Sequence, residues 1–521
     1  MIGASARRPW WNDAVVYQIY PRSFCDTTGN GVGDLEGIRR RLDHIVDLGV
    51  DALWLSPMFR SPMADHGYDV ADYCDVDPLF GSLEDIDRLV AEAHDRGLKV
   101  LLDWVPNHTS DQHPWFLASR SSVGDSKRNW YVWRDGRGVD GSEPPNDWTA
   151  TFPPGPAWSR DDASGQWYLH LFTPEQPDLD WRNPDVVEAM HDTLRFWLDR
   201  AVDGFRMDVI HMIGKDPDGP GREPRSGELE GVGDEPLTHE LLRGIRTVLD
   251  GYGGDRVAIG EVFILNPETV ARFYGHDDEL HLAFYFTPQF TPFRAPDWRA
   301  QISEVAHHFD PRGAWPVWVL NNHDIPRFPT RTGGGDARAK AAALLLLTLR
   351  GTPFLYAGEE LGLEDADVPE HWRQDPAGFR DGCRAPIPWD ASEAHGWATA
   401  ETWLPWPPDA TTRSSASQAG DPSSILNLYR SLIAARKVSP ALREGDLDLL
   451  DVDDERVLSY RRHVQGDERV IMINMSEDDL TVSLAGRWSI EIGTNGPAPN
   501  TPFTGALAPD EAVLLTSNSM R

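Results

Sequence analysis

The chain has 521 residues, of which 40% are hydrophobic and 10% aromatic, and its formal net charge is −34. This length predicts two or three domains, each with a core of its own. The negative charge argues against a nucleic-acid partner, because phosphates attract basic surfaces. No apolar run approaches the roughly 18 residues that a membrane helix needs.

Two features indicate the compartment. Residues 1–12 contain two arginines but no apolar stretch after them, so we expect no signal peptide. The three cysteines, Cys25, Cys74 and Cys383, are too few and too scattered for a disulfide framework or a zinc site. We therefore expect a cytoplasmic protein, monomeric or homodimeric, that contacts neither nucleic acid nor membrane.

Short apolar runs alternate with helical patterns along most of the chain. Strands that alternate with helices form parallel sheets, and eight such units favour an α/β fold of the (β/α)8 TIM-barrel type over an open sheet. The strands are expected at 14–24, 52–58, 99–105, 204–209, 257–263, 281–286, 316–322 and 353–357. The helices between them include 35–48, 82–96, 183–200, 239–250, 336–350 and 424–437.

Two interruptions divide this pattern. Residues 107–177 have no helical period and are too long for an ordinary loop, so they predict a small domain inserted after the third strand. Short alternating stretches predict a C-terminal antiparallel β-sandwich domain at 441–521. The barrel then comprises residues 1–106 and 178–440. The inserted domain and a glycine-rich excursion at 214–234 are expected to narrow the entrance to the barrel.

Charged side chains recur where the predicted strands end. Arg206 and Asp208 close the fourth strand and project to the same side of it, Glu261 closes the fifth, and Asp324 follows the seventh. Taken alone, Arg206 and Asp208 are explained equally well as a structural ion pair or as part of a catalytic site. The carboxyl ends of barrel strands converge on one face, however, and three carboxylates gathered there indicate a catalytic site.

Seven short motifs follow one another in a recognisable order. They are GDLEGI at 33–38, DWVPNH at 103–108, QPDLD at 176–180, GFRMD at 204–208, GEV at 260–262, NHD at 322–324 and GTPFLYAG at 351–358. In this order they resemble the α-amylase superfamily, glycoside hydrolase family 13, and within it the α-glucosidase and oligo-1,6-glucosidase group. The resemblance implies an eight-stranded barrel with an inserted domain and a C-terminal β-sandwich, as the patterns above predict.

The resemblance also implies a double-displacement mechanism that retains the anomeric configuration. Asp208 would be the nucleophile and Glu261 the general acid and later base. Asp324 would orient the 2- and 3-hydroxyls and stabilise the oxocarbenium-like transition state. We expect Arg206 to keep Asp208 ionised, and the apolar strand around Glu261 to favour its protonated form.

Further residues are implied as contacts to the cleaved glucose. His108 and His323 would donate to its hydroxyls, and Tyr68 would stack on its ring. Asp65 would accept from the outermost hydroxyls and pair with Arg384. Such a clamp closes one end of the pocket, so the enzyme is expected to release α-glucose from the non-reducing end of short α-glucosides.

Several functional alternatives stay open. A transglucosylase, or a relative acting on sucrose or trehalose, would use the same covalent glucosyl-enzyme. An inactive carbohydrate-binding relative would have lost one of the three carboxylates, and all three are present. The residue after the expected nucleophile is Val209, which resembles the oligo-1,6-glucosidases, whereas Asp180 stands where that group usually has Asn. The linkage preference therefore stays open.

A glycine-rich loop carries a potential metal site. Oxygen-bearing groups stand at alternate positions: Asp26, Thr28, Asn30, the Val32 carbonyl and Asp34. The spacing is similar to that of an EF-hand loop, and the loop coincides with one that binds calcium or magnesium in the resembled group. We therefore expect one structural Ca²⁺ or Mg²⁺ and no organic cofactor. Thr28 and Asn30 replace residues that are often Asn or Asp, which predicts weak binding.

Overall fold

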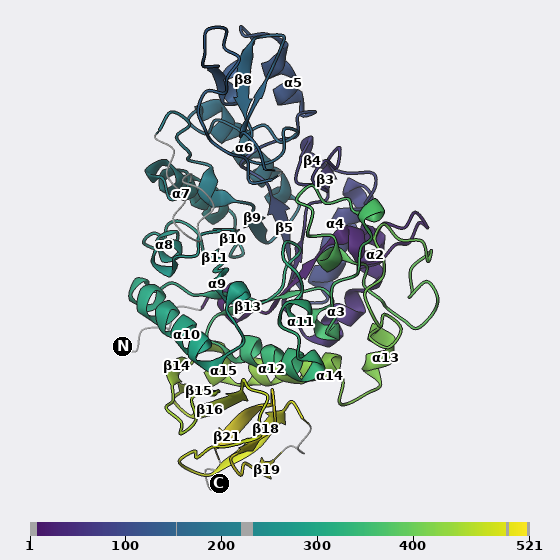
Figure 1. The fold of residues 1–521 in the computed structure, drawn as a ribbon, viewed down its shortest axis with the longest axis vertical. Helices are drawn as coiled ribbons and strands as arrows, with labels where there is room; N and C mark the ends of the chain where they lie inside the picture. The colour runs from purple at the N-terminus through teal and green to yellow at the C-terminus, as the bar shows by residue number, and fades with distance from the viewer. Residues whose placement is uncertain (1–7, 153, 220–232, 496–499, 518–521) are drawn as a thin grey trace.

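The computed structural model describes residues 8–152, 154–219, 233–495 and 500–517. Eight parallel strands form one sheet at the centre of the molecule, in the order β11-β10-β9-β5-β2-β1-β13-β12 (Figure 1). A parallel bridge between Phe284 and Val317 joins its two edges, so the sheet closes and the predicted barrel is confirmed. The strands are β1 Val16–Ile19, β2 Ala52–Leu55, β5 Lys99–Trp104, β9 Gly204–Met207, β10 Val257–Gly260, β11 Leu282–Ala283, β12 Val317–Val319 and β13 Thr352–Tyr356.

Helices surround the barrel, and side-chain caps begin several of them. Ser82 and Asp85 form a capping box at the start of α4, and Asn183 caps α6 with Pro184 at its first position. The helices that follow the strands are α2 Leu35–Arg40 with α3 Leu42–Leu48, α4 Leu83–Asp95, α6 Pro184–Asp199, α7 Pro236–Asp250, α8 Pro267–Arg272, α10 Ala295–Phe309, α12 Gly335–Thr348 and α14 Ile425–Val438.

Several predicted strands are shorter than expected, and one predicted helix is divided. The strand predicted at 14–24 ends at Ile19, because Pro21 has no N–H to donate and begins a 3-10 turn, η1 Pro21–Ser23. The helix predicted at 35–48 is divided at Arg41, whose φ and ψ are −103° and 7°. The guanidinium of Arg41 packs over Trp389, 4.6 Å from the ring centroid, and this contact accompanies the break.

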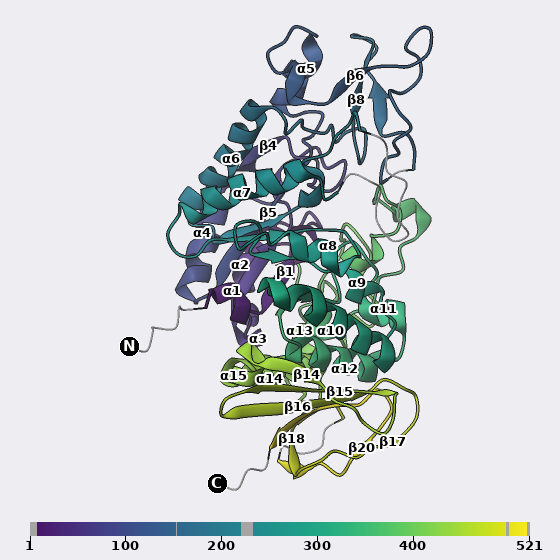
Figure 2. The same cartoon turned by 90° about the vertical axis from the view of Figure 1, so that its left-hand side faces the viewer.

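The segment between β5 and α6 lies at one end of the molecule, away from the C-terminal sheet (Figures 1 and 2). It contains α5 Pro114–Ser121 and an antiparallel sheet of β6 Trp133–Asp135, β8 Gln166–Leu169 and β7 Trp158–Arg160. Its core is aromatic, with Phe116 stacked on Trp133 and edge-on to Tyr168. Of the excursion predicted at 214–234, residues 220–232 lie outside the described ranges.

The C-terminal region forms two antiparallel sheets that pack on each other. One contains, in order, β14 Asp446–Leu449, β15 Val457–Val464, β16 Asp467–Asn474, β21 Ala512–Ser517, β18 Trp488–Gly493 and β19 Thr501–Pro502. The other pairs β17 Leu480–Thr481 with β20 Ala506–Leu507. Leu480 and Leu507 share a buried cluster with Met472 and Leu515, as the predicted sandwich requires. No helix within the described ranges is long and apolar enough to cross a membrane.

Candidate active site

One buried guanidinium connects three carboxylates at the carboxyl end of the barrel. Arg206 Nη1 lies 2.8 Å from Asp103 Oδ1 and 2.7 Å from Asp208 Oδ1, and Nη2 lies 2.7 Å from Glu261 Oε2. The strand register explains this contact, because β9 lies between β5 and β10 and places Arg206 directly beside Asp103. The two carboxylates predicted to cleave the glycosidic bond therefore lie close together.

The residue after Asp208 has an unusual backbone conformation. Val209 has φ 35° and ψ 40°, in the left-handed region that a β-branched residue rarely adopts. Strain of this kind costs about 1–3 kcal/mol and is often found at functional sites. Here the turn directs the Val209 N–H to Glu261 Oε2 at 3.0 Å, so Glu261 accepts from two donors.

Burial and the Arg206 charge act in opposite directions on the carboxylates of this cluster. Burial raises the pKa of Asp208 well above its ordinary value, although Arg206 opposes this effect. Burial likewise raises the pKa of Asp103 to about 7, again against Arg206. Arg206 does favour the ionised form of Asp208, as expected, but burial has the larger effect on the pKa. The physical reason is that one guanidinium is shared by three buried carboxylates and does not offset the desolvation of Asp103 and Asp208.

Asp324 lies on the loop after β12, opposite this cluster. Its Oδ1 is 3.3 Å from Arg380 Nη1 and 3.2 Å from Arg384 Nη2. Burial by itself would raise the pKa of Asp324, but His323, Arg380 and Arg384 together hold it below its ordinary value. Asp324 is thus held as a carboxylate between two arginines.

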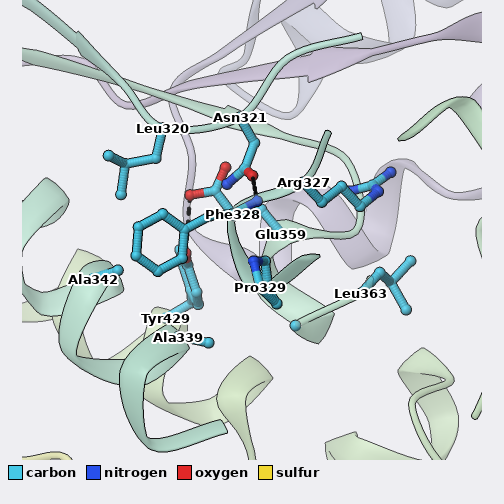
Figure 3. A pocket seen from close by; sticks show the side chains of 11 residues that line it. Leu320, Asn321, Arg327, Phe328, Pro329, Ala339, Ala342, Glu359, Leu363 and Tyr429 are labelled. Atoms are coloured by element: carbon cyan, nitrogen blue, oxygen red, sulfur yellow. Dashed lines mark hydrogen bonds between the residues drawn. The ribbon is translucent and has the colours of Figure 1, made fainter. Parts of the chain in front are cut away.

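Residues that line a small pocket beside this loop support the conformation of the loop. Figure 3 shows Asn321 accepting a hydrogen bond from the backbone N–H of Phe328, which joins the two ends of the loop that carries His323 and Asp324. In the same pocket Tyr429 donates to Glu359 at 3.0 Å. Burial raises the pKa of Glu359 to about 7. Because Glu359 also hydrogen-bonds Asn321, Tyr429 of α14 supports the loop through Glu359.

The arginine paired with Asp65 is not the predicted one. Arg380 Nη2 lies 2.7 Å from Asp65 Oδ1, and Asp375 holds the same guanidinium at 2.6 Å. Arg384 instead donates from Nε to the His323 carbonyl at 2.7 Å and lies beside Asp324. The prediction of an Asp65–Arg384 pair is wrong because the chain turns between the two arginines, at η7 Gly382–Arg384, and presents them to different acceptors.

Two histidines flank Tyr68. The ring of His323 stacks on Tyr68 at 5.5 Å between centroids, and its Nε2 lies 2.6 Å from the tyrosine hydroxyl. His108 Nε2 lies 3.1 Å from the Tyr68 carbonyl and 3.0 Å from Gln176 Nε2. Burial lowers the pKa of His323 to about 3 and that of His108 to about 4, so both rings are neutral at neutral pH.

These groups surround a cavity of about 420 Å³. Seven predicted residues line it: Asp65, Tyr68, His108, Asp208, Val209, Glu261 and Asp324. The other three predicted residues, Arg206, His323 and Arg384, lie directly behind this lining and hold it in place. The cavity is thus a single hollow that brings together residues from Asp65 to Arg380.

Further lining residues were not predicted from the sequence. Gln176 belongs to a recognised motif but carried no assigned role, and Arg380 belongs to no motif. The remaining unpredicted lining residues are mainly apolar: Phe152, Phe172, Met212, Phe263, Phe290, Ile325, Ala377 and Phe379. They come from separate segments of the chain, so no local pattern marks them as a group.

The loop predicted to bind a metal is closed by its own hydrogen bonds. The Asp26 carboxylate accepts from the N–H groups of Thr28, Gly29 and Gly31, and Asn30 Oδ1 accepts from Val32 N–H. Asp34 accepts from the Thr27 and Gly37 N–H groups. The donors of the predicted site are all oxygens, which suits calcium, but a cation must compete with these hydrogen bonds. In the described ranges, no cluster of three or more His, Cys, Asp or Glu side chains is arranged to hold a metal ion.

Comparison with known proteins shows which family the chain resembles. Residues 18–445 match the family model described as "Alpha amylase, catalytic domain". A "Probable alpha-glucosidase" of Rhizobium meliloti is 42% identical, over 92% of this chain and 91% of the relative. An "Oligo-1,6-glucosidase" of Parageobacillus thermoglucosidasius is 37% identical, over 90% of this chain and 91% of the relative.

Solved structures of other proteins are also similar to this chain. The structure of an alpha-glucosyl transfer enzyme superposes with a TM-score of 0.89 at 38% identity, covering 98% of this chain and all of the other. That of a trehalulose synthase superposes with a TM-score of 0.91 at 33% identity, with the same coverage. Since the family model spans most of the chain and the relatives match nearly its full length, the chain belongs to the α-amylase family of glycoside hydrolases, family 13.

Proposed function

We propose that the protein is an exo-acting, retaining α-glucosidase that releases α-glucose from the non-reducing end of short α-glucosides. The observation that carries this proposal is the single cavity in which Asp208, Glu261 and Asp324 meet. The names of the most similar curated relatives support the same activity. All three carboxylates line the cavity, which speaks against an inactive carbohydrate-binding protein.

Two carboxylates have separate roles in bond cleavage. Glu261 protonates the glycosidic oxygen while Asp208 attacks the anomeric carbon, which gives a covalent glucosyl-enzyme. Glu261 then takes a proton from water, and the hydroxide formed releases glucose with its original configuration. Arg206 and the Val209 N–H hold Glu261 in place for both steps.

The remaining polar groups fix the position of the glucose ring. Asp324, held between two arginines, accepts hydrogen bonds from the sugar hydroxyls next to the anomeric carbon. Asp65 with Arg380 clamps the hydroxyls at the opposite end of the ring. Because this buried ion pair closes the cavity there, a glucan chain cannot pass through it, and cleavage is restricted to the terminal unit.

A second candidate function is glucosyl transfer. It is favoured by the resemblance to the alpha-glucosyl transfer enzyme, which matches this chain over its whole length. The same covalent intermediate serves hydrolysis and transfer, and only the acceptor differs. Product analysis at high substrate concentration separates them: hydrolysis gives glucose alone, and transfer gives new glucosides.

We further propose a weakly bound structural Ca²⁺ at the loop formed by residues 26–34. Its support is the set of oxygen donors on Asp26, Thr28, Asn30, Val32 and Asp34. The ion would stiffen the loop and takes no part in the proposed chemistry. For the assembly and compartment we propose a cytoplasmic monomer or homodimer that acts on small glucosides.

The proposed activity is tested by proton NMR of the first glucose released from p-nitrophenyl α-glucoside, whose leaving group is not a sugar. We expect the α-anomer of glucose to appear first and the β-anomer to follow by mutarotation. If the β-anomer appears first, the enzyme inverts and the role proposed for Asp208 fails. If a longer α-glucan oligosaccharide is cut at an internal bond, the exo assignment fails.

A further inference from the structure

An amide side chain lies inside the barrel, behind the residues that line the cavity. Gln18 stands on β1, two residues after Val16, which belongs to a buried apolar cluster contributed by the barrel strands. Side chains two apart on a strand point to the same side, so Gln18 shares this interior, where it is 1% exposed. Its Nε2 lies 2.7 Å from His323 Nδ1 and 3.1 Å from Ser56 Oγ. A polar group is costly to bury unless it is hydrogen-bonded, and His323 is one of the two partners of this amide nitrogen.

The ring of His323 is held on both faces and at both nitrogens. Tyr20 stacks on it at 5.6 Å between centroids with 19° between the planes, and Tyr68 stacks on it as described above. Nδ1 faces Gln18, and Nε2 lies 3.3 Å from Asp324 Oδ2 in addition to the Tyr68 hydroxyl. The ring therefore has one position, and the open question is which nitrogen carries its proton.

The surroundings of each nitrogen answer this question. A neutral imidazole has one N–H donor and one acceptor nitrogen, and burial keeps this ring neutral, with a pKa of about 3. Asp324 is held as a carboxylate, which only accepts, so the nitrogen that faces it carries the proton. Nδ1 is then the acceptor and needs a donor. The amide of Gln18 meets this need only when its NH2 group, and not its carbonyl oxygen, faces the ring.

The same assignment gives one direction to a chain of buried hydrogen bonds. Gln18 donates to His323 Nδ1, His323 donates from Nε2 to the Tyr68 oxygen, and Tyr68 donates to Asp103 Oδ2 at 3.2 Å. Asp103 is paired in turn with Arg206, which holds the two carboxylates that cleave the bond. With the opposite tautomer, the lone pair of Nε2 would face the Asp324 carboxylate, and like charges would repel.

We propose that Gln18 is a positioning residue, which donates to His323 Nδ1 and thereby keeps the Nε2 proton directed at the side of the cavity where Asp324 holds the sugar. This inference rests on the proposed function, because it assigns Gln18 a part in holding glucose. Gln18 does not touch the substrate and acts through His323. Loss of the amide leaves Nδ1 buried without a donor and frees the ring to turn away from Asp324.

The arrangement of protons is tested by neutron diffraction from crystals of the perdeuterated protein. We expect deuterium on His323 Nε2 and none on Nδ1, with the ND2 group of Gln18 facing Nδ1. Deuterium on Nδ1, or the Gln18 oxygen facing the ring, overturns the proposal. This measurement needs no turnover, so its result does not depend on the proposed function.

The contribution to activity is tested by a double-mutant cycle with α-glucosyl fluoride, a donor reactive enough for impaired variants. Gln18→Met should lower kcat/KM at least about tenfold in the unmodified enzyme. In the His323→Ala background the same substitution should change kcat/KM by no more than about twofold, because its partner is gone. An equal loss in both backgrounds would mean that Gln18 only fills space, and it overturns the proposal.

A second buried glutamine provides the matched control. Gln418 is 7% exposed, donates to the Leu361 carbonyl at 2.9 Å and lies outside the cavity lining. Gln418→Met should keep kcat/KM within about twofold, and a loss as large as that of Gln18→Met overturns the proposal. Thermal unfolding verifies that each variant is folded, and if Gln18→Met is not, the neutron structure decides. If the unmodified protein does not hydrolyse α-glucosyl fluoride, the proposed function fails instead.

Discussion

Arg206 donates to Glu261 through one nitrogen and to Asp208 through the other, at 2.7 Å in both cases. The proposed acid and the proposed nucleophile are therefore positioned by the same buried side chain. A change of charge on one carboxylate therefore alters the electrostatic field that the other experiences. Their separate roles must be resolved by chemistry that distinguishes proton transfer from attack on carbon.

The first prediction separates these roles at Glu261. Glu261→Gln should lower kcat/KM for maltose by about 10²–10⁴-fold, because the leaving oxygen loses its proton donor. The loss should be much smaller for α-glucosyl fluoride, whose leaving group needs little protonation. Kinetics on the two donors checks this. Azide should rescue turnover of the variant and give the α-glucosyl azide, whereas an equal loss on both donors would contradict the assignment.

The second prediction concerns the clamp at the far end of the glucose. Arg380→Met leaves Asp65 buried without its ion-pair partner and should lower kcat/KM for maltose by about 100-fold through misplacement of the sugar. Arg373→Met is the matched control, since Arg373 is an exposed arginine of the same loop, and it should stay within about twofold. Equal losses in the two variants would show that Arg380 has no special role.

The third prediction concerns pH. Burial raises the pKa of Asp208, and the nucleophile must be ionised, so its active form declines as pH falls through that raised value. The acid limb of kcat/KM should therefore lie above pH ~4, the ordinary region of an aspartate. Asp103→Asn removes a negative charge that raises the pKa of Asp208, so it should shift this limb to lower pH. A limb at or below pH ~4, or a shift in the opposite direction, would contradict this account.

The fourth prediction concerns the loop at 26–34. Millimolar Ca²⁺ should raise Tm of the EDTA-treated protein, because an ion that binds only the folded state stabilises it. Asp26→Asn should abolish the Ca²⁺-dependent rise, while Asp95→Asn, an exposed aspartate of α4, should retain it. Differential scanning calorimetry with and without Ca²⁺ measures this. If Ca²⁺ leaves the Tm of the unmodified protein unchanged, the proposed Ca²⁺ site is contradicted.

The barrel was predictable because its signals are local. Alternating strand and helix patterns give the units, and charges at the strand ends indicate the catalytic face. Element ends were less predictable: the break at Arg41 accompanies a contact with Trp389, more than 300 residues further along the chain. Such a contact leaves no trace in the pattern around residue 41.

The site was predictable only in part, for the same reason. The strand-end carboxylates occupy recognisable motifs, and the structure brings them to one cavity. The choice of Arg380 over Arg384 as the partner of Asp65 depends on the path of a loop without regular period. The third carboxylate on Arg206, Asp103, comes from the neighbouring strand β5, so the residues beside Asp208 in the sequence did not indicate its contribution.

The most direct test of the central claim is to trap the covalent intermediate with 5-fluoro-α-glucosyl fluoride. The added fluorine slows release of the sugar, and peptide mass spectrometry then locates the ester. The account predicts a single glucosyl label on Asp208, and none in Asp208→Asn. A label on Glu261 or Asp324, or turnover to β-glucose with no label anywhere, would contradict it.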